Sequence, residues 1–136
     1  MELDDIAKVI SLAQDEFGFQ VSDKTTGFWS KEQLEKWVLS DDVLLVAEDK
    51  DEIIGFVLTA MHKPTGKVTW ENQMVSESHC GTGVTEALTK ELEKRLKENG
   101  ATYLHFLVKE TNRAWKYYAR KGFDLGYKFF WFGKQL

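Results

Sequence analysis

The stretch SHCGTGVTEAL, residues 78–88, places Gly81 and Gly83 immediately before a segment with helical periodicity. Glycine in regular structure is unfavourable by about 0.5–1 kcal/mol relative to alanine, so paired glycines at a helix start need a reason. The first turn of a helix leaves four backbone N–H groups without partners, and the helix dipole adds positive potential there. Because glycines let an anion approach the backbone closely, the stretch predicts a phosphate-binding loop.

Other loops also place glycines before a helix. A Walker loop needs Lys and then Ser or Thr after its glycines, and no such pair follows Gly83. A dinucleotide-binding fingerprint needs a third glycine and a downstream acidic residue, which are also missing. Since Gly-x-Gly fits a plain tight turn as well, the neighbouring segments must decide.

Two short helices are expected near the start of the chain. The first is capped by Asp4 or Asp5 and continues with helical spacing to Ala13. The second begins at Ser30, where Ser30 and Gln33 form a capping-box pattern. The polar connection between these helices carries four aromatic residues: Phe17, Phe19, Phe28 and Trp29.

Three strand-like runs follow: VLLVAE at 43–48, EIIGFVLTA at 52–60 and KVTWENQMV at 67–75. The turn segments DKD and KPTG separate them, which predicts an antiparallel meander. After the glycine loop, an amphipathic helix runs to the stop signal Asn99–Gly100.

Three more segments complete the chain. They are a buried-looking strand TYLHFLV at 102–108, a helix TNRAWKYYARK closed by Gly122, and a last strand FDLGYKFFWFGKQL at 123–136. Because strands lie on both sides of the long helix, we expect an α/β (α+β) fold. Its sheet is mixed but mostly antiparallel, and about four helices flank it.

Length and composition exclude several classes of protein. The 136 residues fit one domain, 1–136, and the net charge of -4 weighs against a nucleic-acid partner. A single cysteine, Cys80, excludes an internal disulfide and favours a cytoplasmic location. No apolar run approaches 18 residues, so no membrane span is expected. The three histidines share no metal-ligand spacing, so we expect no metal, and both a monomer and a homodimer stay open.

Two motifs resemble the GNAT superfamily of N-acetyltransferases. The segment VSESHCGTGVTEAL, residues 75–88, is similar to its acetyl-CoA-binding motif. The segment NRAWKYYARKGF, residues 112–123, resembles its closing Asn…Ala…Tyr…Gly-Phe signature. The positions that match the two patterns are Val75, Gly81, Gly83, Val84, Leu88, Tyr118, Gly122 and Phe123.

The sequence departs from the family pattern at several positions. Cys80 replaces the arginine before the first glycine, and Glu77 replaces a proline. Asn112 lies one residue nearer Tyr118 than is usual. The family's first strand is missing, so either the sheet is one strand short or the chain has been trimmed.

The resemblance implies direct attack of an amine on the thioester of acetyl-CoA, the cosubstrate. Tyr118 matches the tyrosine that protonates the leaving thiolate, and a phenol holds its proton at neutral pH. The alternative role for Tyr118 is packing between helix and sheet. Glu71 is the candidate base for the amine, and its alternative is a solvated acid on an exposed strand face.

The resemblance also assigns binding residues. Met74 and Val75 present main-chain groups to the pantetheine arm, and Asn112 flanks the pantetheine or adenine end. Phe28 and Trp29 roof the acceptor pocket, or belong to the core. The pyrophosphate is surrounded by Cys80, Gly81, Thr82, Gly83, Val84 and Thr85. The implied function is an N-acetyltransferase acting on a primary amine, and the alternative is a non-catalytic CoA-binding or protein-interaction module.

Overall fold

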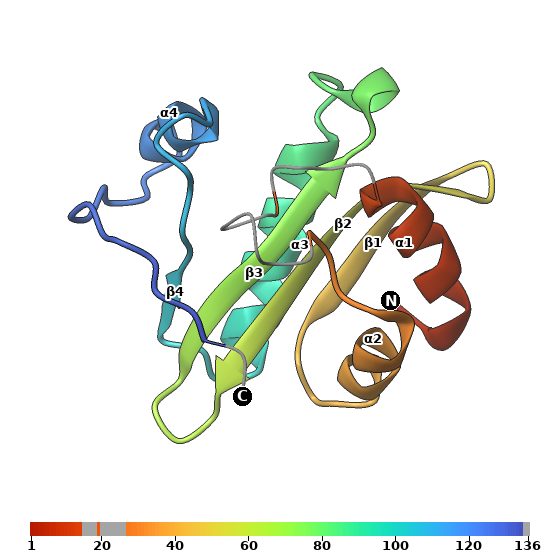
Figure 1. Cartoon of the computed structure of the whole chain (residues 1–136), viewed down its shortest axis with the longest axis horizontal. Coiled ribbons are helices and arrows are strands. Elements are labelled where there is room, and N and C mark those ends of the chain that lie inside the picture. The colour runs from red at the N-terminus through yellow and green to blue at the C-terminus, as the bar shows by residue number, and fades with distance from the viewer. Residues whose placement is uncertain (15–18, 20–26, 135–136) are drawn as a thin grey trace.

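The computed structural model describes residues 1–14, 19 and 27–134 (Figure 1). Short 3-10 helices precede α1 and α3. The elements in chain order are η1 (Leu3–Asp5), α1 (Ile6–Ala13), α2 (Lys31–Val38), β1 (Leu44–Asp49), β2 (Glu52–His62), β3 (Lys67–Val75), η3 (Glu77–His79), α3 (Val84–Glu98), β4 (Tyr103–His105) and α4 (Ala114–Arg120). Within the described residues, no helix is long and apolar enough to cross a bilayer.

The strands form one four-stranded sheet in the order β1-β2-β3-β4. The first three pair antiparallel, which confirms the predicted meander, and β4 runs parallel to β3 after the α3 crossover. Helices α1 and α2 lie on one face of the sheet and α3 lies on the other (Figure 1). The predicted mixed sheet with four flanking helices is therefore confirmed.

The strand β2 forms the centre of both cores because helices cover both of its faces. Successive side chains of a strand point to opposite faces. Accordingly, Phe56 and Leu58 face α1 and α2, whereas Val57 packs with Leu88 and Leu92 of α3. This double burial explains why β2 is a nearly continuous apolar run.

Local signals place the first helix boundaries. Ser30 Oγ accepts from Gln33 N at 3.3 Å and Gln33 Oε1 accepts from Ser30 N at 2.9 Å, which confirms the predicted capping box. The chain enters α1 through η1. Asp5 is the N-cap residue of α1, as predicted, but its side chain makes no cap hydrogen bond there. Its carboxylate instead accepts from Glu2 N at 2.7 Å, and Glu2 is the N-cap of η1.

The C-terminal region differs most from the prediction. The strand expected at 102–108 pairs only over Tyr103–His105, and Tyr103 and Leu107 are exposed rather than buried. The last strand, expected at 123–136, is wrong for the described residues 123–134, which form no helix or strand. An alternating apolar pattern does not make a strand without a neighbour to pair with, and this tail has none among the described residues.

Candidate functional site

The glycine loop lies immediately before α3, where the sequence predicted it. Gly81 and Gly83 have φ angles of 76° and 92°, in the left-handed region where side chains are strained. Gly83 is the N-cap of α3. A Cβ built at either glycine would meet no atom within 4 Å, so the space beside both glycines is open.

This open space is lined by unsatisfied backbone donors. Among the residues that the structure describes, five successive or nearly successive N–H groups have no hydrogen-bond partner: those of Gly81, Gly83, Val84, Thr85 and Glu86. The positive end of the α3 dipole adds to their potential. Lys121 also brings an ammonium here, 2.9 Å from the Glu86 carboxylate. The loop therefore fits an anion of the size of a phosphate.

The side chains of the loop turn back onto its own backbone. The Thr82 hydroxyl donates to His79 O at 2.7 Å. Cys80 is exposed, and its Sγ lies 3.5 Å from Ser76 O and 3.9 Å from Val75 O. Because neither side chain enters the space beside the glycines, the donors of the loop remain accessible.

The β3 edge beside this loop is free. β4 pairs only with Lys67–Thr69, so the rest of β3 has no strand partner on that side among the described residues. Met74 faces Phe56 in register, and Ser76 N donates to Ile54 O at 2.8 Å. Main-chain groups alternate along a strand, so those of Met74 point to β2 and those of Val75 point to the free edge. Of the two predicted residues, only Val75 turns its main-chain groups to this edge, and its carbonyl oxygen also lies 3.9 Å from Cys80 Sγ.

Glu71 lies at a β-bulge. Trp70 pairs with Thr59 and Asn72 pairs with Leu58, so Glu71 is an extra residue on β3. A bulge interrupts the alternation of a strand and re-aims a side chain. As a result, Glu71 and Asn72 both face the side of the sheet that carries α2.

On that side, Glu71 lines a pocket of about 340 Å³ with the indoles of Trp29 and Trp37. The two rings are 5.1 Å apart at 80°. Trp29 Nε1 donates to Asn72 at 2.6 Å, and Trp37 Nε1 donates to Asp42 at 3.0 Å. Because both indole N–H groups are bound by the protein, the pocket wall is mainly ring carbon. The remaining lining residues are Gln33, Lys36 and Ala60.

The other predicted aromatic residues do not line this pocket. Phe28 packs in the core, 5.4 Å from the Phe56 ring, and Phe19 packs against both. Phe17 lies outside the described residues. Of the predicted acceptor-binding pair, only Trp29 reaches the pocket.

The Glu71 carboxyl is partly shielded from water. Burial raises its pKa above the usual value, and the nearby His105 ring opposes this shift. The Lys36 ammonium is held by Glu32 at 2.8 Å. The result is a carboxyl group beside an apolar pocket, more basic than an exposed one.

Tyr118 lies on the opposite face of the sheet, on α4. Its hydroxyl donates to Gln73 Oε1 at 2.7 Å, and its ring packs against Trp70 and Phe106. Burial, and secondarily the neighbouring Tyr117, raises the pKa of Tyr118 to about 12. The phenol is therefore neutral over the physiological range. Asn112 lies just before α4, whose N-cap is Arg113, and its Oδ1 accepts from Ala114 N at 2.9 Å.

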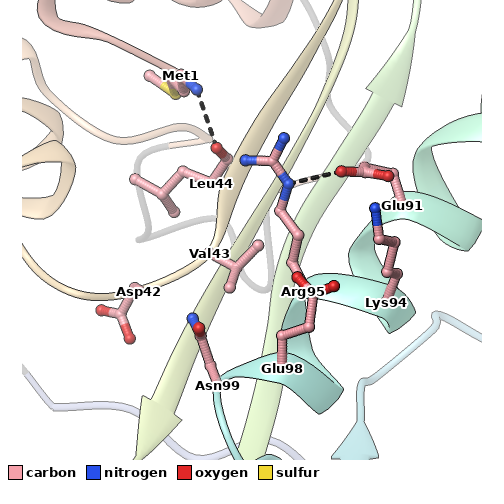
Figure 2. Close-up of a pocket in the computed structure, with 9 residues that line it drawn as sticks. All are labelled: Met1, Asp42, Val43, Leu44, Glu91, Lys94, Arg95, Glu98 and Asn99. Carbon is pink, nitrogen blue, oxygen red and sulfur yellow. Dashed lines mark hydrogen bonds and ion pairs between the residues drawn. The ribbon is translucent and has the colours of Figure 1, made fainter.

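A second pocket, of about 490 Å³, lies between β1 and the C-terminal half of α3 (Figure 2). Its charged groups are largely paired with the protein itself, as in the 2.7 Å contact of Arg95 with Glu91. The glycine loop lies at the other end of α3, so this pocket is not part of the site.

The structure brings four further residues to the site that the sequence did not single out. They are Trp37, Asn72, Gln73 and Lys121. The spacing of Trp37 and Gln73 matches an ordinary core pattern, and no local signal separates them from packing residues. The pairing of Lys121 with Glu86 spans 35 residues, so local spacing did not reveal it.

Comparisons with known proteins give the family. No curated protein matches the sequence. The fold is similar to ribosomal-protein-S18-alanine N-acetyltransferase from Escherichia coli, with TM-score 0.75, 19% identity and coverage of 93% of this chain and 76% of that chain. It is also similar to PaiA N-acetyltransferase from Thermoplasma acidophilum, solved with coenzyme A, with TM-score 0.75, 18% identity and coverage of 90% and 84%.

A third solved structure is AAC(6')-Iy with the bisubstrate analogue CoA-S-monomethyl-acetylneamine. It has TM-score 0.79 and 16% identity, and the match covers 100% of this chain and 95% of that chain. The family model described as "Acetyltransferase (GNAT) family" matches residues 6–123. The chain therefore belongs to the GNAT acetyltransferase family.

Proposed function

We propose that this protein transfers an acetyl group from acetyl-CoA to a primary amine by direct attack in a ternary complex. The observation that carries the proposal is the set of unpaired N–H groups at Gly81, Gly83 and the first turn of α3, beside open space. These donors suit the diphosphate of coenzyme A. Two similar folds solved with coenzyme A or a CoA-linked analogue add support.

The rest of the cosubstrate fits the free edge of β3. An extended pantetheine arm can pair with the main-chain groups that Val75 turns to this edge, as an added strand does. The Thr85 hydroxyl adds a donor near the phosphates. Cys80 stands where the family pattern has arginine, and the Lys121 ammonium near the first turn of α3 supplies a cation in its place.

The acceptor fits the pocket of Trp29, Trp37 and Glu71. Aromatic ring faces attract a cation, and a partly buried carboxylate pairs with one. We therefore infer that the acceptor is an amine carried on an apolar or alkyl chain, which enters from the α2 face.

The reaction then divides between the two faces of the sheet. The amine nitrogen forms a bond to the acetyl carbon, and Glu71 accepts the proton that the nitrogen loses, directly or through a water. The bond from carbon to sulfur breaks, and the leaving sulfur takes a proton from the Tyr118 hydroxyl. A free N–H at the β3 edge is placed to stabilise charge on the carbonyl oxygen.

Calorimetric titration with acetyl-CoA and a thiol-release assay across a panel of alkyl amines test this function. We expect saturable binding and thiol release that depends on both substrates. Trp29→Ala should raise KM for the amine about tenfold, within the range for a cation–π contact, without changing acetyl-CoA affinity. Binding without thiol release for any amine would indicate a binding module. Absence of acetyl-CoA binding would exclude both.

A further inference from the structure

Gln73 holds the hydroxyl of Tyr118 in an otherwise aromatic environment. The rings of Trp70, Phe106 and Phe123 surround Tyr118 with centroids 5.5, 4.6 and 5.6 Å away. The Gln73 carboxamide, at 2.7 Å, is the hydroxyl's hydrogen-bond partner in the described part of the chain. The position of the phenol oxygen is therefore set by one side chain of β3.

The other end of this carboxamide is unsatisfied. Gln73 Nε2 is buried and has no partner among the described residues. Such groups are rare in folded proteins and unfavourable, so each needs a reason. The reason is not packing alone, because an apolar side chain of similar length would fill the same space without an unpaired donor.

The carboxamide can be used in two orientations. A half-turn about its last torsion exchanges Oε1 and Nε2. In either orientation one amide atom bonds the Tyr118 oxygen and the other is left over, so the number of hydrogen bonds is the same. The orientations differ in what the phenol does, since it donates to Oε1 in one and accepts from Nε2 in the other.

We propose that Gln73 is the positioning residue for Tyr118 and that its carboxamide reverses during the reaction. With Oε1 toward the phenol, the hydroxyl proton is held by Gln73. With Nε2 toward the phenol, that proton is free to pass to the leaving sulfur. The O–H bond breaks, an S–H bond forms, and the Nε2–H bond stabilises the phenolate left behind. This inference rests on the proposed role of Tyr118 as the acid.

Three variants at Gln73 and Tyr118 test the inference. Gln73→Met keeps the length of the side chain but loses both polar atoms. Gln73→Glu, when ionised, can accept a hydrogen bond from the Tyr118 hydroxyl but cannot donate one. We expect both to lower kcat about tenfold, with KM for acetyl-CoA and amine within about threefold of wild type, since an acid contributes about 10²-fold or more. In a Tyr118→Phe background, Gln73→Met should cause no further loss. Gln14→Met, at an exposed glutamine, is the matched control and should leave kcat unchanged.

Each of the following outcomes would overturn one part of the proposal. Wild-type kcat in Gln73→Met, a change confined to KM, or losses that multiply in the double variant would each overturn the positioning role. Wild-type kcat in Gln73→Glu would overturn the donor orientation. Wild-type kcat in Tyr118→Phe would overturn the acid itself, which is a failure of the proposed function. The double variant removes both polar partners and should melt at or above the wild-type temperature, which separates lost catalysis from unfolding.

Discussion

Two parts of the chain differ sharply in how they are packed. Among the described residues, every buried apolar side chain lies at or before Leu96. After that residue, Phe106, Tyr118 and Phe123 are only partly buried against the α3 core. The tail instead exposes a series of large apolar side chains: Leu125, Tyr127, Phe129, Phe130, Trp131 and Phe132.

The proposed site joins the well-packed part, up to residue 98, to the weakly packed part, residues 99–134. The anion-binding loop, the free edge of β3 and Glu71 belong to the well-packed part, whereas Tyr118 comes from the weakly packed part. Side-chain contacts link them at Tyr118–Gln73 and Lys121–Glu86. Regions with few buried contacts open at low free energy. In the proposed mechanism, the main-chain donors and Glu71 therefore come from the well-packed part, whereas the acid Tyr118 and the Lys121 cation depend on how the weakly packed part docks.

The largest expected effect is on the free energy of unfolding, for a phenylalanine replaced in each of the two parts. Phe56→Ala removes a ring that is 0% exposed at the centre of the sheet and should lower the free energy of unfolding by about 3–5 kcal/mol. Phe130→Ala changes the same residue type where it is 89% exposed and should change it by less than about 0.5 kcal/mol. Urea denaturation measures both values.

The difference between the two variants tests whether the tail is exposed. A loss of several kcal/mol for Phe130→Ala would mean that the tail is buried in solution, against its own chain or another. The contrast between the two parts would then be wrong.

An intermediate effect is expected at the two glycines that bound α3. Gly83 faces the loop, whereas Gly100, with φ 82°, marks the start of the weakly packed part. A Cβ at either position meets open space, so Ala strains only the backbone, by about 1–2 kcal/mol. Both variants should lose similar stability, and Gly83→Ala alone should weaken acetyl-CoA binding, about tenfold or more. Calorimetric titration of both variants measures this difference, and equal affinities would show that the loop does not hold the diphosphate.

Most of the well-packed part was predictable from the sequence because its signals are local. The Ser30–Gln33 capping box, the turns between β1, β2 and β3, and the stop at Gly100 each depend on residues within a few positions. The tail also has a strand-like alternation, but a strand needs a partner from elsewhere in the chain. Local periodicity does not show whether a distant segment is available to pair. The alternation in residues 123–134 therefore predicted a strand that the structure does not have.

The candidate site also combines features that follow from local sequence with features that depend on distant contacts. The glycine loop before a helix follows from a short stretch, and the structure places it before α3 with both glycines in the left-handed region. The bulge at Glu71 depends on the register between β2 and β3, which alternation alone does not reveal. For the same reason the sequence did not predict that Asn72 anchors Trp29, or that Gln73 meets Tyr118 across 45 residues.

The smallest expected effect compares two carboxylates within the well-packed part. Burial raises the pKa of Glu71, so the folded state binds its proton more tightly than the unfolded state. The free energy of unfolding therefore falls as pH rises from the unfolded pKa of about 4.5 to the folded value, and the loss persists at pH 7. Glu71→Gln should melt slightly above wild type at pH 7, and this gain should vanish below the unfolded pKa.

Glu91 is the matched control with the opposite sign. Its hydrogen bond to Arg95 lowers its pKa, so it stabilises the fold above the unfolded pKa and loses this as pH falls through the folded value. Glu91→Gln should melt slightly below wild type at pH 7, by a small amount because the pair is exposed. Thermal melts of both variants from pH 3 to pH 7 test the two signs together. If Glu71→Gln also melted lower at pH 7, the charge of Glu71 would be stabilising, through His105. The carboxylate would then be a structural ion-pair partner, and the case for Glu71 as the base at the bulge would fail.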